Sequence, residues 1–151
     1  MGEVVGRVAG LFRYAVKSFG AEVLDAVDAS WHGLAGDRRW AFIRDGMTHR
    51  GFPWLTIRQR PTMWRYVPWL TEPDRPDASP AVVRTPSGAV LEVADPALAA
   101  ELGTGAPVLK CDRGVFDTFP LSLLTVQSVA GLGALAGVEL EPARFPPQPR
   151  H

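Results

Sequence analysis

Two short segments near the start of the chain carry side chains that could bind an anion. The first, residues 14–20, has the sequence YAVKSFG and places Lys17 and Ser18 just before a glycine. A lysine ammonium supplies positive charge, a serine hydroxyl supplies a hydrogen bond, and the backbone N–H groups of a turn supply further donors. Together these groups suit a phosphate. On the local pattern alone, an ordinary solvated loop is the more common explanation.

The second segment, residues 33–40, has the sequence GLAGDRRW. Its two glycines and Asp37 predict a tight turn that projects Arg38 and Arg39 at the start of a strand. A guanidinium group can hold a phosphate with two parallel hydrogen bonds. The alternative is a surface ion pair between Asp37 and one of the two arginines.

Other reactive side chains give weaker indications. His49 could exchange a proton near neutral pH, but a lone histidine is more often structural or exposed, and the claims of His32 and His151 are weaker still. The spacing of the three histidines does not match a zinc site. Cys111 stands close to Arg113, which could lower a thiol pKa, yet a packed and inert thiol is the more common outcome. The sequence contains no P-loop, GxGxxG, GxSxG or HExxH motif.

The elements that must position these side chains are short and mostly strands. Fifteen glycines and 14 prolines in 151 residues favour frequent turns, as in a barrel. We expect eight or nine strands; the candidates are residues 3–12, 21–31, 39–43, 47–50, 54–57, 63–67, 81–84, 89–93 and 107–110. Turns at 45–46 and 86–88 predict two hairpins, and residues 68–80, rich in proline, predict an exposed loop.

Capping residues predict two helices. Asp95 as N-cap, Pro96 at the first helical position and Gly103 at the end define a short helix over residues 96–102. Thr125 could cap a second helix from Val126 to about residue 135. Its apolar face is made of Val126, Val129, Leu132 and Leu135.

Composition and charge limit the function classes. The 16 Lys and Arg residues balance 16 Asp and Glu residues, so the chain lacks the global basic field that drives non-specific nucleic-acid binding. One cysteine favours a reducing, cytoplasmic environment. No apolar run approaches the length of a membrane span, and we expect neither a membrane association nor a signal peptide.

Four segments, in order, resemble the MOSC family, named after the C-terminal domain of molybdenum cofactor sulfurase. The family pattern is approximately L-x-x-Y-P-V-K-S and then G-L-x-x-D-R-x-W, and it is similar to residues 11–18 and 33–40. A later T-x-R-x-x-P-x-L is similar to residues 48–55. Residues 116–125, with Ser128, resemble the entry into the MOSC domain proper.

The resemblance implies a mainly β fold. Residues 1–108 would form the barrel-like MOSC N-terminal domain, and residues 109–151 would be the incomplete start of the MOSC domain. The family includes the mitochondrial amidoxime-reducing component and bacterial proteins that reduce N-hydroxylated compounds, so the full-length form is expected to be a molybdenum-dependent oxidoreductase or a sulfur carrier. The resemblance also implies a redox partner of ferredoxin or flavin type for the full-length form. The family is also associated with pyridoxal phosphate binding.

The implied cofactor is a molybdopterin-type molybdenum cofactor. By similarity, Lys17, Ser18 and Arg38 would contact its phosphate-bearing pterin, and Thr118 would lie near another family contact. These include the anion-binding groups noted above. The resemblance assigns no catalytic residue and no metal ligand to this chain.

The end of the sequence departs from the family pattern. The family continues R-F-R-P-N, whereas residues 144–151 read RFPPQPRH. The text CGC TTC CGC CCC AAC CTC GTC AC encodes RFRPNLV, and one C inserted after TTC makes it encode RFPPQPRH. We therefore expect a frameshifted tail at 146–151. The metal-ligating cysteine region would be missing, leaving this chain inactive and the apolar face of residues 126–135 without partners.

A second hypothesis belongs to a different class. The chain could be a non-enzymatic β-barrel that binds protein or single-stranded nucleic acid through aromatic rings and arginines. Its best support is a cluster made of Trp54, Arg58, Arg60, Trp64, Arg65 and Tyr66. The neutral net charge makes nucleic acid the less favoured partner.

Overall fold

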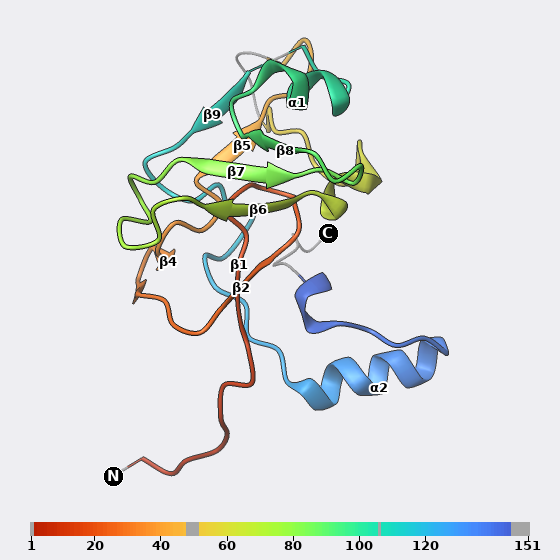
Figure 1. Ribbon diagram of the computed structural model, residues 1–151. Helices are drawn as coiled ribbons and strands as arrows, with labels where there is room; N and C mark the ends of the chain where they lie inside the picture. Colours follow the sequence, from red (N-terminus) through yellow and green to blue (C-terminus); the bar gives the residue numbers. More distant parts are fainter. Residues whose placement is uncertain (1, 48–51, 106, 146–151) are drawn as a thin grey trace.

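The computed structural model describes residues 2–47, 52–105 and 107–145. Within these ranges the fold is mainly β with two short α-helices (Figure 1). The strands are β1 (Leu11–Arg13), β2 (Glu22–Leu24), β3 (Ala29–Ser30), β4 (Gly33–Leu34), β5 (Trp40–Phe42), β6 (Val67–Leu70), β7 (Ala81–Arg84), β8 (Val90–Glu92) and β9 (Val108–Lys110). The helices are α1 (Pro96–Glu101) and α2 (Val126–Ala136), with 3-10 turns η1 (Pro61–Arg65) and η2 (Pro142–Arg144).

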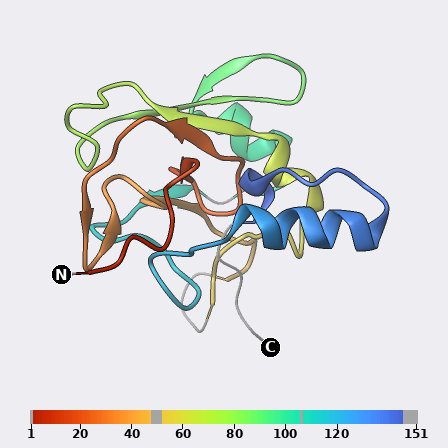
Figure 2. The ribbon, with the colours of Figure 1, turned by 90° about the horizontal axis from the view of Figure 1, so that it is seen from below.

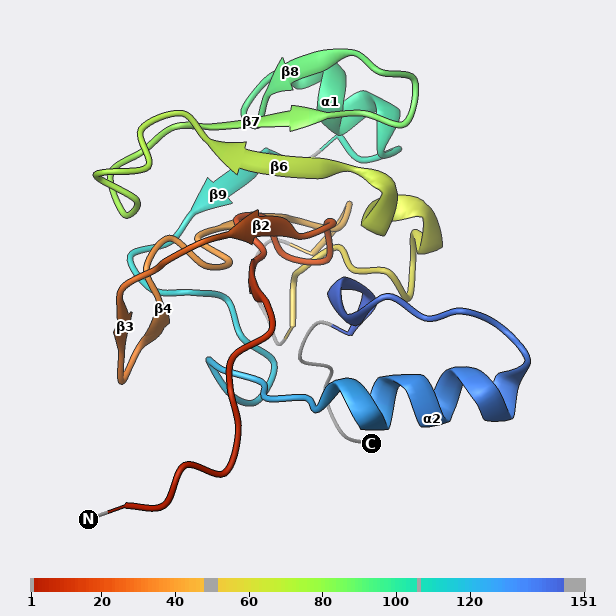
Figure 3. The same ribbon diagram turned by 60° about the horizontal axis from the view of Figure 1, so that its bottom comes forward.

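The nine strands of the described ranges form four small sheets and no closed barrel. Three sheets are antiparallel pairs, β1–β2, β3–β4 and β5–β9, and the fourth has the order β6–β7–β8. Figure 3 shows the three-stranded sheet above β9 and β2. The predicted closure is therefore not found among these residues, because strands of two to four residues end before their edges can join into one continuous ladder.

Several predicted elements are confirmed. Strand β7 pairs with β8 around the turn at 86–88, with Val83 opposite Leu91. The carboxylate of Asp95 accepts a hydrogen bond from Ala97 N–H at 2.8 Å and caps α1. The hydroxyl of Thr125 accepts from Ser128 N–H at 3.1 Å and caps α2. Strands at 40–42 and 108–110 also lie where they were expected.

Other predictions are wrong. Residues 2–10 form no strand, and Val5 is 95% exposed, because no neighbouring strand lies beside this segment. Residues 63–67 were expected to be a strand, but η1 ends at Arg65 and β6 starts at Val67. Pro68 therefore lies in a strand and not in the loop, which begins at residue 71. The span 21–31 is divided between β2 and β3, and residues 33–34 pair with β3 where only a turn was expected.

The partner of β5 also differs from the prediction. The expected hairpin joined residues 39–43 to 47–50, of which 48–50 lie outside the described residues. Instead β5 pairs with β9, with Trp40 opposite Lys110 and Phe42 opposite Val108. The pairing continues past β9, because Cys111 N–H donates to Arg39 O at 2.7 Å. This long-range pair brings the chain after residue 110 beside the GLAGDRRW turn.

The hydrophobic core lies between the sheets. Phe19 is 1% exposed and packs its ring against Phe42 at 5.6 Å and Tyr66 at 5.3 Å, measured between ring centroids. Met63 and Leu98 are fully buried in the same cluster. Residues 15–19 thus run through the core, which fixes the backbone that carries Lys17 and Ser18.

Helix α2 lies at the edge of the molecule, away from the sheets (Figures 1 and 2). As expected, Val126, Leu132 and Leu135 are exposed, by 50%, 48% and 88%. Val129 is 5% exposed, which corrects the prediction for that residue. The chain turns back along the helix after Gly137, where Val138 N–H donates to Gly133 O, and so covers Val129. No helix in the described ranges has the length and apolarity needed to cross a bilayer.

Candidate anion-binding site

Backbone hydrogen bonds hold the two predicted anion-binding segments side by side. Arg38 N–H donates to Tyr14 O at 2.7 Å, and Lys17 N–H donates to Trp40 O at 2.8 Å. Between them, Trp40 N–H donates to Ala15 O at 3.2 Å. The segments 14–17 and 38–40 therefore run next to each other. Lys17 and Arg38 belong to these neighbouring segments although 21 positions separate them in the sequence.

Two of the residues predicted to contact the cofactor have an unusual backbone conformation. Ser18 has φ 67° and Arg38 has φ 47°, and within the described ranges these are the non-glycine residues with positive φ. The left-handed region costs a residue with a Cβ roughly 1–2 kcal/mol. Strain of this kind concentrates at functional sites, where the surrounding structure holds it in place.

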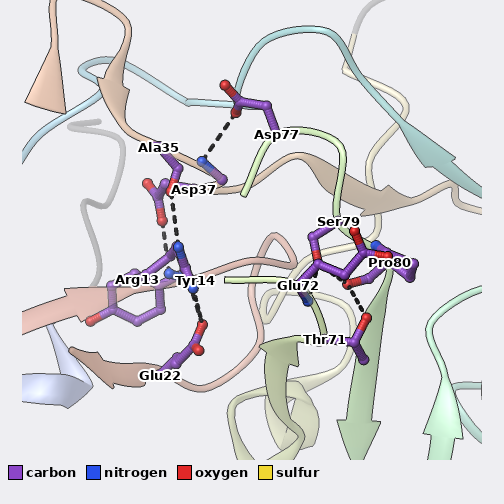
Figure 4. Close-up of polar contacts among 11 residues, drawn as sticks. Arg13, Tyr14, Glu22, Ala35, Asp37, Thr71, Glu72, Asp77, Ser79 and Pro80 are labelled. Carbon is purple, nitrogen blue, oxygen red and sulfur yellow. Dashed lines mark hydrogen bonds and ion pairs between the residues drawn. The ribbon is translucent and has the colours of Figure 1, made fainter. Parts of the chain in front are cut away.

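Asp37 links the two segments from inside the protein. One carboxylate oxygen accepts Tyr14 N–H at 2.7 Å (Figure 4). The other accepts Arg38 Nε–H at 2.8 Å. The Asp37 and Arg38 side chains are 2% and 7% exposed, so their ion pair is buried and not the surface pair weighed from the sequence. Burial raises the pKa of the Asp37 carboxyl, while the Arg38 guanidinium and the Tyr14 N–H act in the opposite direction.

Neighbouring contacts hold the turn from its other sides. Arg13 donates to Ala35 O at 3.2 Å and forms an ion pair with Glu22 at 2.9 Å, and Figure 4 shows both beside Asp37. The hydroxyl of Tyr14 donates to Ala143 O at 2.9 Å. Burial, and next the charge of Asp37, raises the pKa of Tyr14 to about 12. The phenol therefore stays a donor across the neutral range.

Lys17 is a buried cation and not part of a solvated loop. Its side chain is 4% exposed, its Nζ lies 2.7 Å from Asp117 Oδ1, and it also donates to Val115 O at 3.1 Å. The ring of Phe52 lies 5.3 Å from Nζ, within cation–π range. Burial lowers the pKa of Lys17, and the charges of Arg38 and Arg58 lower it further, against the opposing effect of Asp117.

The side chain of Arg38 meets the same stretch of chain as Lys17. Its Nη2 donates to Pro120 O at 3.1 Å, and its guanidinium lies 4.4 Å from the Phe116 ring centroid. The backbone joins in, because Val115 N–H donates to Arg38 O at 2.8 Å. We call residues 115–120 the covering segment, since it lies over both cations. Pro120 comes so close to Gly33 that a Cβ there would lie 2.9 Å from Pro120 Cβ.

The remaining predicted contacts lie at the margin of this site. Ser18 is half-buried beside Lys17, and Thr118 is exposed on the covering segment. The structure thus brings Lys17, Arg38 and the Thr118 segment together. Sequence reasoning assigned no role here to Asp117 or to Arg58, since both come from distant parts of the chain. Only the position of Asp117 next to the predicted contact Thr118 could have indicated from the sequence that Asp117 belongs to this site.

The other reactive residues lie elsewhere. His32 contacts Trp31, with ring centroids 4.1 Å apart, at the exposed tip of the β3–β4 hairpin. His49 and His151 lie outside the described residues. Burial raises the pKa of the Cys111 thiol, which fits the inert interpretation. Across the ranges that the structure describes, no group of three or more His, Cys, Asp or Glu side chains is placed to hold a metal ion.

The aromatic and basic residues of the binding-module hypothesis do not share one surface. Tyr66 is 5% exposed, and its hydroxyl donates to Glu101 at 2.9 Å. Arg60 donates to Gly103 O, and Trp54 is half-buried. The exposed ring of Trp64 has the Arg144 guanidinium 4.6 Å from its centroid. A continuous stacking platform is therefore not formed by these side chains.

Comparison with known proteins and family models assigns the sequence, and not the site geometry, to a family. No curated protein and no solved structure matches the chain. The sequence model of the MOSC N-terminal beta barrel domain matches residues 5–96, which is more than half of the chain. The matched range contains both segments that carry Lys17 and Arg38. The chain belongs to the family of MOSC N-terminal beta barrel domain proteins.

Proposed function

We propose that this chain binds the phosphate-bearing pterin of a molybdenum cofactor through Lys17, Ser18 and Arg38. The observation that carries the proposal is the convergence of two buried cations from separate segments, joined by backbone hydrogen bonds. The association of the MOSC family with the molybdenum cofactor supports the choice of ligand. Thr118 adds a hydroxyl at the edge of the same site.

The donor set fits the phosphate end of such a cofactor. Lys17, Arg38 and the nearby Arg58 carry three positive charges against the two carboxylates of Asp37 and Asp117. The excess charge favours an anion, and a guanidinium with an ammonium is a common pair for phosphate. Ser18 can donate its hydroxyl to a phosphate oxygen. Asp37 keeps the Arg38 Nε occupied and so fixes the direction of the guanidinium.

When bound, the cofactor supplies a molybdenum centre for oxidation–reduction chemistry. The residues named here bind and orient its pterin end. Reduction of N-hydroxylated compounds or carriage of sulfur, with an electron-donating partner of ferredoxin or flavin type, is the activity that we propose for the full-length form. Two expectations from the sequence stay predictions. One is that residues 1–108 form the N-terminal domain and residues 109–151 the start of the next domain, and the other is that the protein is cytoplasmic.

The test is cofactor content after expression in a bacterium that makes molybdenum cofactor. The purified protein is oxidised in acid and the released fluorescent pterin is quantified per mole of protein. Wild type should carry pterin, whereas Lys17→Gln and Ser18→Ala should each carry at least about tenfold less, since one charged or polar contact to phosphate is lost.

The matched control is Arg75→Gln. Arg75 is an exposed cation that pairs with Glu72, remote from Lys17. Its pterin content should equal that of wild type. Circular dichroism checks that each variant is folded. Wild type with no more pterin than an unrelated protein from the same host would overturn the proposal.

A further inference from the structure

We propose that Asp117 acts as an internal counter-ion in the anion site, so that a ligand binds by displacing the covering segment, residues 115–120. This inference rests on the proposed function, since it concerns the same cations. It also narrows the ligand class. A doubly charged phosphate monoester can replace the singly charged Asp117 carboxylate, whereas a ligand with one carboxylate gains nothing by the exchange.

The first argument is that the covering segment already occupies the donors of the site. Lys17 Nζ is held by the Asp117 carboxylate at 2.7 Å and by Val115 O at 3.1 Å. Arg38 Nη2 donates to Pro120 O, and the face of its guanidinium lies against Phe116. Since both side chains are almost fully buried, an external anion can reach them only if these contacts open.

The second argument is that little else holds the covering segment. No strand or helix is formed between the end of β9 at Lys110 and the start of α2 at Val126. Thr118 is exposed, and Phe119 is 68% exposed. Its polar contacts to the rest of the described protein are those to Lys17 and Arg38, and one local bond runs from Phe116 N–H to Gly114 O at 3.1 Å. Opening it breaks the side-chain contacts of Lys17 and Arg38, which an anion can replace, together with the Val115 N–H bond to Arg38 O and the packing of Pro120 on Gly33.

The third argument concerns charge. Lys17 and Arg38 each have one carboxylate neighbour, Asp117 and Asp37. Asp37 comes from within the turn and also binds Tyr14 N–H, so it is part of the scaffold. Asp117 is 15% exposed and comes from the segment with no regular structure. Of the two, Asp117 is the carboxylate that a ligand can exchange.

The experiment titrates the full chain with inorganic phosphate at fixed pH and ionic strength, followed by backbone amide NMR signals. Asp117→Asn should bind phosphate about tenfold more tightly than wild type, because the competing internal charge is gone. Asp112→Asn is the matched control, since Asp112 is an exposed carboxylate five residues earlier. It should bind as wild type does. In all three proteins acetate should bind far more weakly than phosphate.

A second measurement follows the displacement itself. The amide of Val115 donates to Arg38 O, so its hydrogen exchange reports whether the covering segment is closed. Saturating phosphate should speed this exchange in wild type, while the amide of Val83, which lies in the core, should be unaffected.

The outcomes separate the two proposals. Equal phosphate affinity in wild type and Asp117→Asn, with unchanged Val115 exchange, overturns the counter-ion role and leaves the anion site standing. No phosphate binding in wild type or in Asp117→Asn overturns both. A tenfold gain that disappears when Lys17→Gln is added to Asp117→Asn supports both.

Discussion

Asp37 is the residue on which the arrangement of the two cations depends most directly. It is 2% exposed and holds Tyr14 N–H and Arg38 Nε–H with separate oxygens. A carboxylate suits this position because both partners are donors. The left-handed φ of Arg38 is sustained by these contacts, since they fix the backbone on one side and the side chain on the other.

At this scale we predict that Asp37→Asn lowers the free energy of unfolding by about 3 kcal/mol. The amide would place an N–H against one of the two donors and leave Arg38 as a buried charge without its partner. Urea unfolding followed by tryptophan fluorescence measures the change. Glu72→Gln is the control, because its partner Arg75 is exposed, and it should cost less than about 1 kcal/mol. Similar values for the two variants would contradict a structural role for Asp37.

Among the elements, α2 has two glycines inside it and one at its C-cap, and the three serve different needs. Gly131 lies inside the helix with open space around it. At Gly133 a Cβ would lie 2.7 Å from Val138 O, where the returning chain crosses. Gly137 ends the helix with φ 68°. Only the second and third positions need glycine, for close approach and for backbone conformation.

Replacement of glycine by alanine should therefore change the free energy of unfolding in opposite directions at Gly131 and Gly137. Gly131→Ala should stabilise the protein by about 0.5–1 kcal/mol, because alanine loses less backbone entropy in a helix. Gly137→Ala should destabilise it by about 1 kcal/mol, because a Cβ disfavours the left-handed region. Far-UV circular dichroism with urea unfolding measures both. If both variants change the free energy of unfolding in the same direction, the explanation from helix entropy at Gly131 and left-handed backbone at Gly137 is contradicted.

At the scale of the described molecule, exposed apolar side chains are most concentrated in residues 119–138. They lie on and around α2, away from the core between the sheets; those exposed by 46% or more are Phe119, Leu121, Leu123, Leu124, Val126, Leu132, Leu135 and Val138. A grouping of this size on a protein surface favours self-association. Apolar side chains are also exposed elsewhere, as at Val5, Val23 and Val90, but residues 119–138 hold eight of them within 20 positions. We therefore place this property in the C-terminal stretch.

We predict that the double variant Leu123→Gln, Leu135→Gln aggregates less than wild type. Both leucines are almost fully exposed, by 89% and 88%, so their replacement should change the free energy of unfolding by less than about 0.5 kcal/mol. Static light scattering over a concentration series measures the effect. Val5→Gln is the control, because Val5 is equally exposed on the separate N-terminal segment. It should leave the scattering unchanged, and a double variant that scatters as wild type does would refute the prediction.

The sequence by itself determined the local features. The caps Asp95 and Thr125, the β7–β8 hairpin and the turn that presents Arg38 follow from residues within a few positions of each other. It also indicated that Lys17 and Arg38 suit an anion. The tertiary structure alone decided that β5 pairs with β9, and that the cations are buried under residues 115–120. Lys17 and Asp117 are 100 positions apart, and a contact over that distance depends on the path of the whole chain. Local propensity contains no information about that path, whereas caps and turns are satisfied by their immediate neighbours.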